Sequence, residues 1–382
     1  MRNICIVVTA RPSYARVKTL LNAIKKHPKL KLSLIVTGSA LLDKYGSVIN
    51  VIKKDGFEPT SIVHILIEGE SLLTSAKSTG LGIIELSNTF HNLKPDIVIS
   101  IADRYETMAT AIASSYQNIP VAHIQGGEVT GSIDEKVRHS VTKLSDFHFV
   151  SNKDAADRII KMGENKKNVY ISGCPSIDLA KAIENKKVKK NIRLPLKGVG
   201  HDVVLDEPYL VVMQHPVTYE WDKAFDHINM TLSAIHELNI QTIWFWPNVD
   251  AGSDDSSRAI RIFRENKINN KIRFVKNLPP EEFLILLKSS LCLVGNSSVG
   301  IRECSYLGIP VVNIGTRQDG RKRGENVLDV TYDKKTIKNA ILNQIEKKKL
   351  KKNTIYGNGV AGKFIADVLS KVDLISEKKI TY

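Results

Sequence analysis

The fold of this chain is indicated most clearly by residues 293–321, LVGNSSVGIRECSYLGIPVVNIGTRQDGR. An apolar run at 291–294 predicts a strand, and it ends in the small-residue loop Gly295-Asn296-Ser297-Ser298. A helical stretch follows over 300–307, and the apolar run 311–314 predicts the next strand. Strand, loop, helix and strand in this order predict a βαβ unit of a parallel sheet.

The loop of this unit predicts an anion site. The first N–H groups of a helix have no partner within the helix, and the helix dipole makes them attract negative charge. Ser297 and Ser298 add hydroxyl donors, and Glu303 can accept hydrogen bonds from sugar hydroxyls. Arg317 and Arg321 follow the second strand. Phosphate-binding groups, a hydroxyl acceptor and an arginine pair together indicate a nucleoside diphosphate.

Length and composition set wider limits. A chain of 382 residues exceeds one compact core, so we expect two domains. The four cysteines have no C-x-x-C spacing, which favours a reducing cytoplasm and argues against a zinc site or a disulfide framework. The N-terminal apolar run is too short for a signal peptide, and no apolar stretch approaches the roughly 18 residues of a membrane span.

The net charge of +15 raises nucleic-acid binding as an alternative. The lysines are spread along the chain, and the clusters at 186–190 and 347–352 lack interleaved aromatic residues. We therefore interpret the charge as a solvated surface that also attracts small anionic substrates, with neither nucleic acid nor a membrane as partner.

Apolar runs alternate with amphipathic stretches through both halves of the chain. The strands predicted are 4–8, 32–36, 97–101, 121–124, 147–150, 169–171, 210–213, 242–246, 272–275, 291–294 and 311–314. The helices predicted are 15–26, 80–92, 105–115, 134–144, 154–162, 222–237, 256–265, 281–288, 300–307, 335–347 and about 362–372.

This alternation predicts an α/β fold of two doubly wound, Rossmann-like domains that face each other across a ligand-binding cleft. The polar, basic stretch 184–206 is the expected crossing between them. The domains are then 1–183 and 184–362, and a C-terminal helix at about 363–382 is expected to pack back on the first domain.

Polar residues follow several predicted strands of the first domain. Arg11 follows the first strand, where it can meet a phosphate or be an ordinary loop residue. Asp103 follows the strand 97–101 and is either a catalytic carboxylate or the cap of the next helix. The adjacent Arg104 can keep that carboxylate ionised or bind phosphate.

The densest polar segment is 123–139, HIQGGEVTGSIDEKVRH, in which a strand runs into a Gly-Gly turn and a helix start. It contributes Gln125, Glu128, Asp134 and Arg138. The last two share a helix face at i,i+4, as do residues 135 and 139. This grouping favours a functional site over a capping box with a surface ion pair.

The second domain adds His215, which closes its first strand just before a proline that holds it in extended geometry. Taken alone, a histidine of this kind is more often a structural residue than a functional one. Asn248 and Asp250 lie in the next strand's loop, which lines a sugar pocket or is a plain turn. Together, polar groups at the same end of two parallel sheets indicate an enzyme acting on a nucleotide-linked sugar.

At these residues the chain resembles the hydrolysing UDP-N-acetylglucosamine 2-epimerases. The resembling segments, from Arg11 to about Gly359, are Asp103-Arg104, HIQGGEVTGSIDEKVRHSVTKL, SGCPSIDLA, QHPVT, PNVDAGS, GNSSVGIRE and GTRQDGRKRGENVL. The last two, at that spacing, are very specific. The resemblance implies a glycosyltransferase-B-like fold and a homodimer or homotetramer.

The resemblance also implies the reaction. UDP-GlcNAc binds in the interdomain cleft, and loss of the C2 proton with departure of UDP gives 2-acetamidoglucal. Water then adds, releasing N-acetylmannosamine for a sialic-acid-type sugar. No metal, NAD or pyridoxal cofactor is implied. The acid/base candidates are, by position, Asp103, Glu128, Asp134, Asp178 and His215.

For binding, the resemblance implies that Ser297 and Ser298 hold the diphosphate, that Glu303 holds the ribose, and that Arg11 and Arg317 neutralise phosphate charge. The full set of substrate-binding candidates is Arg11, Arg104, Gln125, Arg138, Asn248, Asp250, Gly295, Asn296, Ser297, Ser298, Glu303, Arg317 and Arg321.

Gln125 departs from the family pattern, which often has Glu at this position. An amide cannot act as a general base, so the chemistry is expected on Asp103, Asp134 or Glu128, or the enzyme is tuned to a different sugar. The alternatives are the same reaction on UDP-2,4-diacetamido-2,4,6-trideoxyglucose, on the way to legionaminic acid, and a glycosyltransferase of the same fold.

Overall fold

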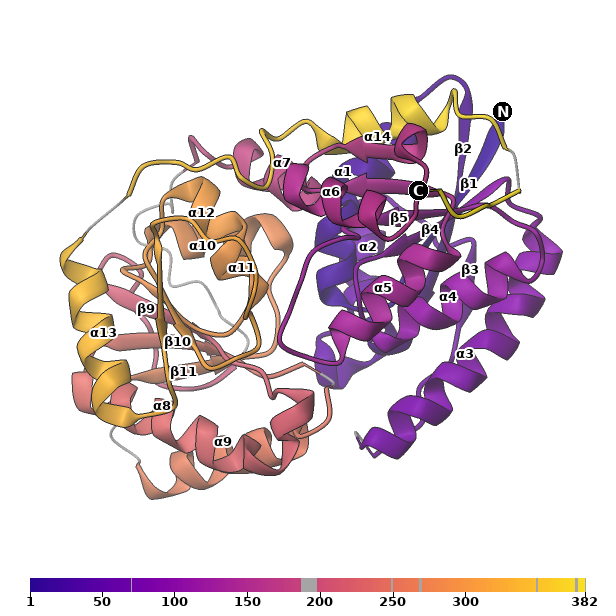
Figure 1. Ribbon diagram of the computed structural model, residues 1–382. Helices are drawn as coiled ribbons and strands as arrows, with labels where there is room; N and C mark the ends of the chain where they lie inside the picture. Colours follow the sequence, from indigo (N-terminus) through magenta and orange to yellow (C-terminus); the bar gives the residue numbers. More distant parts are fainter. Residues whose placement is uncertain are drawn as a thin grey trace. The chain divides into compact units, whose positions relative to one another are not determined.

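The computed structural model describes residues 1–69, 71–186, 198–248, 250–267, 270–347, 350–374 and 377–381 (Figure 1). The chain forms two compact units. The first comprises Met1–Val129, Ile133–Lys181 and Ile355–Tyr382, and the second comprises Thr130–Ser132 and Ala182–Thr354. The chain therefore returns to the first unit at Ile355, ahead of the boundary at 363 that the sequence suggested.

The first unit contains a seven-stranded parallel sheet in the order β3-β2-β1-β4-β5-β6-β7. Its strands are β1 (Arg2–Val8), β2 (Leu30–Thr37), β3 (Ser61–Val63), β4 (Ile97–Ile101), β5 (Val121–Ile124), β6 (Phe147–Val150) and β7 (Val169–Ile171). Its helices are α1 (Arg11–Lys26), α2 (Val48–Lys54), α3 (Leu72–Leu93), α4 (Tyr105–Ser115), α5 (Asp134–Leu144), α6 (Lys153–Lys161), α7 (Pro175–Ala182) and α14 (Ala361–Leu369).

Strand β1 explains why its sequence is continuously apolar. Ile4 and Ile6 pack into a core with residues of α1 and α14, whereas Cys5 and Val7 pack into a second core with residues of α3 and α4. A parallel strand covered on both faces needs apolar residues at every position. The same core holds Ile365 of α14, so the C-terminal helix packs on the first unit (Figure 1).

The second unit has a seven-stranded sheet in the order β14-β13-β12-β9-β10-β11-β8, and among its described residues only the β8–β11 pairing is antiparallel. Its strands are β8 (Gly198–Gly200), β9 (Tyr209–Met213), β10 (Gln241–Phe245), β11 (Ile272–Val275), β12 (Leu293–Gly295), β13 (Val311–Ile314) and β14 (Val327–Val330). Its helices are α8 (Ala224–Leu238), α9 (Ser253–Asn266), α10 (Pro280–Ser289), α11 (Ser298–Ile301), α12 (Glu303–Leu307) and α13 (Lys334–Glu346).

Several elements were not predicted by the apolar pattern, namely β3, β8, β14, α2 and α7. Strands β3, β8 and β14 lie at sheet edges and are partly exposed, so they lack a long apolar run. Strand β8 lies in the stretch expected as a crossing, of which residues 187–197 fall outside the described part of the chain. The helix predicted at 300–307 is divided at Arg302, so Glu303 begins α12.

No helix in the described part of the chain is both long and apolar enough to cross a membrane.

Candidate active site

The order of the first sheet reverses between β1 and β4, and the loops after these two strands carry Arg11 and Asp103. Ligands of doubly wound folds bind at such a switch point. Arg11 is the first residue of α1, and its burial lowers the pKa of the guanidinium to about 10, so the cation persists at neutral pH. Asp103 is only 6% exposed and follows Ala102, whose φ of 66° lies in the left-handed region. Surrounding contacts must hold this backbone in place.

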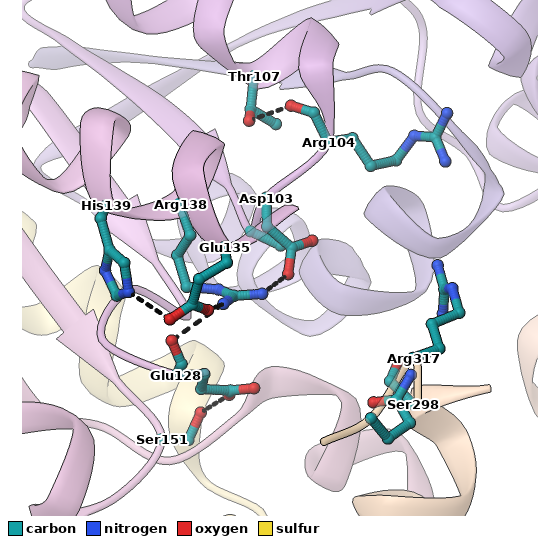
Figure 2. Close-up of polar contacts among 12 residues, drawn as sticks. Asp103, Arg104, Thr107, Glu128, Glu135, Arg138, His139, Ser151, Ser298 and Arg317 are labelled. Atoms are coloured by element: carbon teal, nitrogen blue, oxygen red, sulfur yellow. Dashed lines mark hydrogen bonds and ion pairs between the residues drawn. The ribbon is translucent and has the colours of Figure 1, made fainter. Parts of the chain in front are cut away.

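Asp103 forms an ion pair with Arg138 of α5 (Figure 2). The Arg138 side chain is 1% exposed, and its Nη1 donates to Glu128 O and to Glu135 Oε2, both at 2.9 Å. Burial opposes the guanidinium charge, but the attraction of Asp103 and Glu128 outweighs burial and raises the pKa of Arg138. A permanent cation beside Asp103 favours its carboxylate form.

Arg104, which the sequence suggested as the charge partner of Asp103, forms its ion pair with Glu106. The Arg104 Nε lies 3.1 Å from Glu106 Oε2, and Glu106 is fully buried. Arg104 is itself the N-cap residue of α4, so Asp103 is not the cap that the alternative interpretation required. The Asp103 carboxylate therefore pairs with Arg138 and does not cap α4.

The buried imidazole of His123 connects the Asp103 loop to α5. Its Nε2 lies 2.8 Å from Ala102 O, and its Nδ1 lies 3.2 Å from Thr142 Oγ1. Because a carbonyl only accepts, Nε2 carries the proton and Nδ1 accepts from the Thr142 hydroxyl. Burial lowers the pKa of His123 to about 3, so the ring is neutral. The ring thus holds the residue before Asp103 against the helix that bears Arg138.

Two glycines in the loop after β5 are required by close approach. A Cβ at Gly126 would lie 2.8 Å from His123 Nδ1, and one at Gly127 would lie 2.3 Å from Ala155 O. Gly127 also has a φ of 73°. The Gly-Gly pair therefore lets the backbone pass between His123 and α6.

The residues on either side of these glycines are both buried. Gln125 donates from Nε2 to Cys174 Sγ at 2.6 Å. Glu128 accepts from Ser151 Oγ at 2.5 Å and is 5% exposed (Figure 2). Because its backbone carbonyl is bound to Arg138, Glu128 joins the group around Asp103, whereas Gln125 faces a thiol.

Asp134 is the first residue of α5, and its charge adds to the field that favours the cation of Arg138. The i,i+4 contact predicted between residues 135 and 139 is present, with 2.9 Å between His139 Nε2 and Glu135 Oε1. Four acidic groups, Asp103, Glu128, Asp134 and Glu135, thus act on a single buried arginine.

Asp178 has different surroundings. Its carboxylate accepts the backbone N–H groups of Ala361 at 2.9 Å and Gly362 at 2.7 Å, and the Thr19 hydroxyl at 3.1 Å. These N–H groups begin α14, so Asp178 supplies the negative charge that a helix N-terminus favours. Burial, the largest influence, raises the pKa of Asp178 despite these bonds. Its described contacts fasten the C-terminal helix to the first unit.

In the second sheet the order reverses between β9 and β12, and the loops after these strands carry His215 and Asn296. The Asn296 amide pairs with the His215 main chain: Oδ1 accepts from His215 N and Nδ2 donates to His215 O, both at 2.8 Å. Gly295 precedes it with a φ of 126°, and a Cβ there would lie 2.2 Å from Met213 O. Only glycine lets the two loops approach this closely.

The His215 ring is oriented by its neighbour loop. The backbone N–H of Asn248 donates to Nδ1 at 3.2 Å. Nδ1 therefore presents its lone pair, and the neutral ring carries its proton on Nε2. His215 is only 4% exposed. The arrangement presents a hydrogen-bond donor at Nε2.

The helix predicted after the small-residue loop begins with Ser297 as its N-cap, whose hydroxyl accepts from Val299 N at 3.4 Å. Ser298 Oγ accepts from Arg302 Nη2 at 2.6 Å. Glu303 Oε2 is buried and has no hydrogen-bond partner among the described residues, although Arg302 Nε lies 3.8 Å away. Glu303 therefore has a buried oxygen suited to accepting from a ligand hydroxyl.

The arginines after β13 are fixed by their own surroundings. Arg317 donates from Nη1 to Asn296 O at 3.4 Å, and its Nη2 lies 3.6 Å from Asp250 Oδ2. Arg321 is 6% exposed, and its carbonyl accepts from Arg323 Nη1 at 2.7 Å. Cationic groups and the Asn296 loop thus share one side of the second unit.

Sequence reasoning missed the roles of His123, Thr142 and Glu106. His123 begins the HIQGG motif, and Thr142 lies four residues after Arg138 on the same helix face, so a helical projection of α5 would have suggested Thr142. Nothing in the local pattern around Glu106 separates it from an ordinary acidic residue in a first helical turn.

Two doubly wound sheets, each with polar loops at its switch point, define a two-domain α/β protein of the glycosyltransferase-B-like class. Residues 22–370 match the model of the UDP-N-acetylglucosamine 2-epimerase family, and the chain belongs to that family.

Relatives with related names cover most of the chain. A UDP-N,N'-diacetylbacillosamine 2-epimerase (hydrolyzing) from Legionella pneumophila is 31% identical over 99% of this chain and 98% of its own length. A UDP-N-acetylglucosamine 2-epimerase from Neisseria meningitidis serogroup B is 32% identical over 89% of this chain and 87% of its own. Among solved structures, the Methanocaldococcus jannaschii UDP-GlcNAc 2-epimerase in complex with UDP-GlcNAc and UDP has a TM-score of 0.78, with 19% identity over 96% of this chain and 99% of that chain.

Proposed function

We propose that this protein is a hydrolysing UDP-N-acetylglucosamine 2-epimerase, which converts UDP-GlcNAc and water into N-acetylmannosamine and UDP for a sialic-acid-type sugar. The observation that carries the proposal is the buried pair of Asp103 and Arg138 at the switch point of the first sheet. An ionised carboxylate held by a permanent cation suits proton transfer at a weakly acidic carbon, which needs a precisely oriented base.

The first half of the reaction is an elimination. A carboxylate takes the proton from C2 of the sugar while the bond from C1 to the phosphate oxygen breaks, giving 2-acetamidoglucal and UDP. We assign the acid/base work to Asp103, Glu128 and Asp134, whose charges converge on Arg138. In the second half, water adds hydroxyl to C1 and a proton to C2 from the opposite face, which yields N-acetylmannosamine.

His215 is assigned to the leaving group. A neutral ring with its proton on Nε2 can donate a hydrogen bond to the phosphate oxygen that departs from C1. Nδ1 is occupied by the N–H of Asn248, which supports the donor role over that of a base. Stabilising the charge that develops on a leaving oxygen is one of the larger contributions to catalysis.

UDP binding is assigned mainly to residues of the second unit, with contributions from residues of the first. Ser297, Ser298 and the N-terminus of α11 bind the diphosphate, with Arg317 and Arg11 as counter-charges. Glu303 accepts from the ribose hydroxyls, which supplies a partner for its buried Oε2. The remaining substrate-binding assignments are Arg104, Gln125, Arg138, Asn248, Asp250, Gly295, Asn296 and Arg321.

Asp178 leaves the acid/base set in this proposal, because its carboxylate is engaged by the N-terminus of α14. We assign it to holding that helix. Asp178→Asn should therefore lower stability more than it lowers turnover per folded molecule. The cytoplasmic location belongs to the same proposal, and the four cysteines, all in the described part of the chain, are buried and form no disulfide.

The test is incubation of the purified protein with UDP-GlcNAc in deuterium oxide, followed by NMR of the products. The mechanism predicts free UDP and N-acetylmannosamine carrying deuterium at C2. Product without deuterium at C2 would exclude proton abstraction. UDP-N-acetylmannosamine as the lasting product, with no UDP released, would indicate the non-hydrolysing reaction.

A second candidate substrate is UDP-N,N'-diacetylbacillosamine, the 2,4-diacetamido-2,4,6-trideoxy sugar nucleotide. It is favoured by the relative that matches over 99% of this chain, whose name specifies that substrate. The two candidates differ at C4 and C6 and share the reacting C1 and C2. Turnover of both UDP-sugars under the same conditions decides between them, and the preferred substrate should have the higher kcat/KM.

A further inference from the structure

After α14 the C-terminal tail continues on the first unit and contacts Gly163, just after the end of α6. The backbone N–H of Thr381 donates to Gly163 O at 3.0 Å. A Cβ at Gly163 would lie 2.4 Å from Ile380 Cγ1, so the tail packs closely on this glycine. The described tail residues, 377–381, are therefore attached to the body of the unit by backbone and side-chain contacts.

Lys378 inserts from this tail into the C-terminal end of α5. Its Nζ lies 2.7 Å from Glu164 Oε2 and donates to the carbonyls of Ser145 at 2.5 Å and Thr142 at 3.1 Å. Its side chain is 26% exposed. The last carbonyls of a helix lack partners within the helix and carry the negative end of its dipole, so a lysine here satisfies both.

Glu164 provides a buried anchor for this lysine. Its side chain is 2% exposed and also contacts Lys143 Nζ at 2.6 Å and His148 Nε2 at 3.0 Å. Lys143 belongs to α5 and His148 to β6, so one carboxylate joins the tail, the helix and the sheet. Each of the three donors stabilises a charge that would be costly to bury alone.

The same helix also contacts the group assigned to catalysis. Thr142, whose carbonyl accepts from Lys378, donates its hydroxyl to His123, and His123 holds Ala102 beside Asp103. Arg138, one turn earlier on α5, pairs with Asp103. A displacement of the C-terminal end of α5 would therefore reach the Asp103 carboxylate along two routes, through the His123 bridge and through the ion pair.

We propose that residues 377–381 form a C-terminal clasp in which Lys378 is a positioning residue for α5 and so for the Asp103–Arg138 pair. This inference rests on the proposed function, because it assumes that the pair acts in turnover. The clasp belongs to the first unit, whereas His215 and the loop after β12 that carries Asn296 belong to the second unit. Its loss should therefore change kcat and leave UDP affinity unchanged.

The experiment compares Lys378→Met with Lys378→Arg and with a matched control, Lys379→Met. Lys379 is the next residue, and its side chain is 83% exposed. Lys378→Met should lower kcat by about tenfold or more, since small misplacements of reacting groups have large effects on rate. KM and the dissociation constant of UDP should stay within about twofold. Arginine retains charge and donors and should restore much of kcat, and the control should match the natural protein.

A purely structural role gives a different result. If Lys378→Met lowers the melting temperature while kcat of the folded enzyme is unchanged, the clasp does not position the pair and the proposal is overturned. A fall in both kcat and the affinity for UDP would also overturn the proposal, because the effect would then extend beyond α5.

Hydrogen exchange of the peptide 134–144 separates failure of the clasp from failure of the proposed function. Faster exchange in Lys378→Met and in a chain ending at residue 374, but not in Lys379→Met, supports the clasp even if the natural protein does not turn over UDP-GlcNAc. Unchanged exchange in both altered proteins overturns it.

Discussion

Replacing Arg138 by methionine tests the central pair of the first unit most directly. Methionine has a similar length and fills the buried space, but it has neither charge nor donors. The substitution leaves the Asp103 carboxylate buried without its ion-pair partner, and it removes the donor to Glu128 O. Both losses occur where the Arg138 side chain is 1% exposed, so water cannot easily replace the lost contacts.

The expected loss of stability is about 3–5 kcal/mol, the range for breaking one side of a buried ion pair. Because about 1.4 kcal/mol corresponds to tenfold, the unfolding equilibrium constant should rise by about two to four orders of magnitude. Without the cation, protonation of Asp103 in the folded protein becomes easier. A carboxyl group that binds its proton more tightly when folded gains stability as pH falls, so the deficit should be smaller at about pH 5 than at about pH 7.

Urea unfolding followed by far-UV circular dichroism measures this loss, with Lys136→Met on the exposed side of the same helix as the control. All three tryptophans, Trp221, Trp244 and Trp246, lie in the second unit, so their fluorescence reports that unit separately. The control should change stability by less than about 0.5 kcal/mol. A loss below about 1 kcal/mol for Arg138→Met, or one equal at both pH values, would refute the buried-pair reasoning.

Three further changes test other parts of the structure. Asn296→Leu removes both hydrogen bonds to the His215 main chain, so UDP affinity should fall by about tenfold or more in calorimetric titration; unchanged affinity would contradict the loop assignment. His215→Gln keeps an N–H donor of similar reach and should retain more turnover than His215→Ala, and equal rates would remove the donor role. Burial opposes ionisation of Glu164, but hydrogen bonds from His148 and two lysines outweigh it and lower its pKa to about 2. A carboxyl group with a lowered pKa contributes stability that is complete above about pH 4.3 and is lost as the pH falls toward 2. In Glu164→Gln, the free energy of unfolding should therefore depend less on pH in that window. An unchanged pH dependence would contradict this assignment.

The strands in the interior of the two sheets could be predicted from the sequence. β4, β5 and β13 were predicted at their observed bounds, because strands buried on both faces need unbroken apolar runs. Edge strands such as β3 and β14 have mixed surroundings and lack that signal. The loops were predictable for a related reason: in parallel sheets, polar residues directly after a strand lie at the ligand-binding edge.

The sequence by itself therefore determined the architecture, the family and which loops carry polar groups. Only the tertiary structure decided which side chains meet. Local rules act over three or four residues, and they suggested Arg104 for Asp103, yet the ion pair forms with Arg138, 35 positions away. Asp178 accepts from the backbone N–H of Ala361, at the N-terminus of α14 and 183 positions away in the sequence. Likewise, the His215 main chain is bound by Asn296, 81 positions away. Such partners depend on how whole strands and helices align when the sheet and its covering helices assemble, and no short stretch of sequence carries that information.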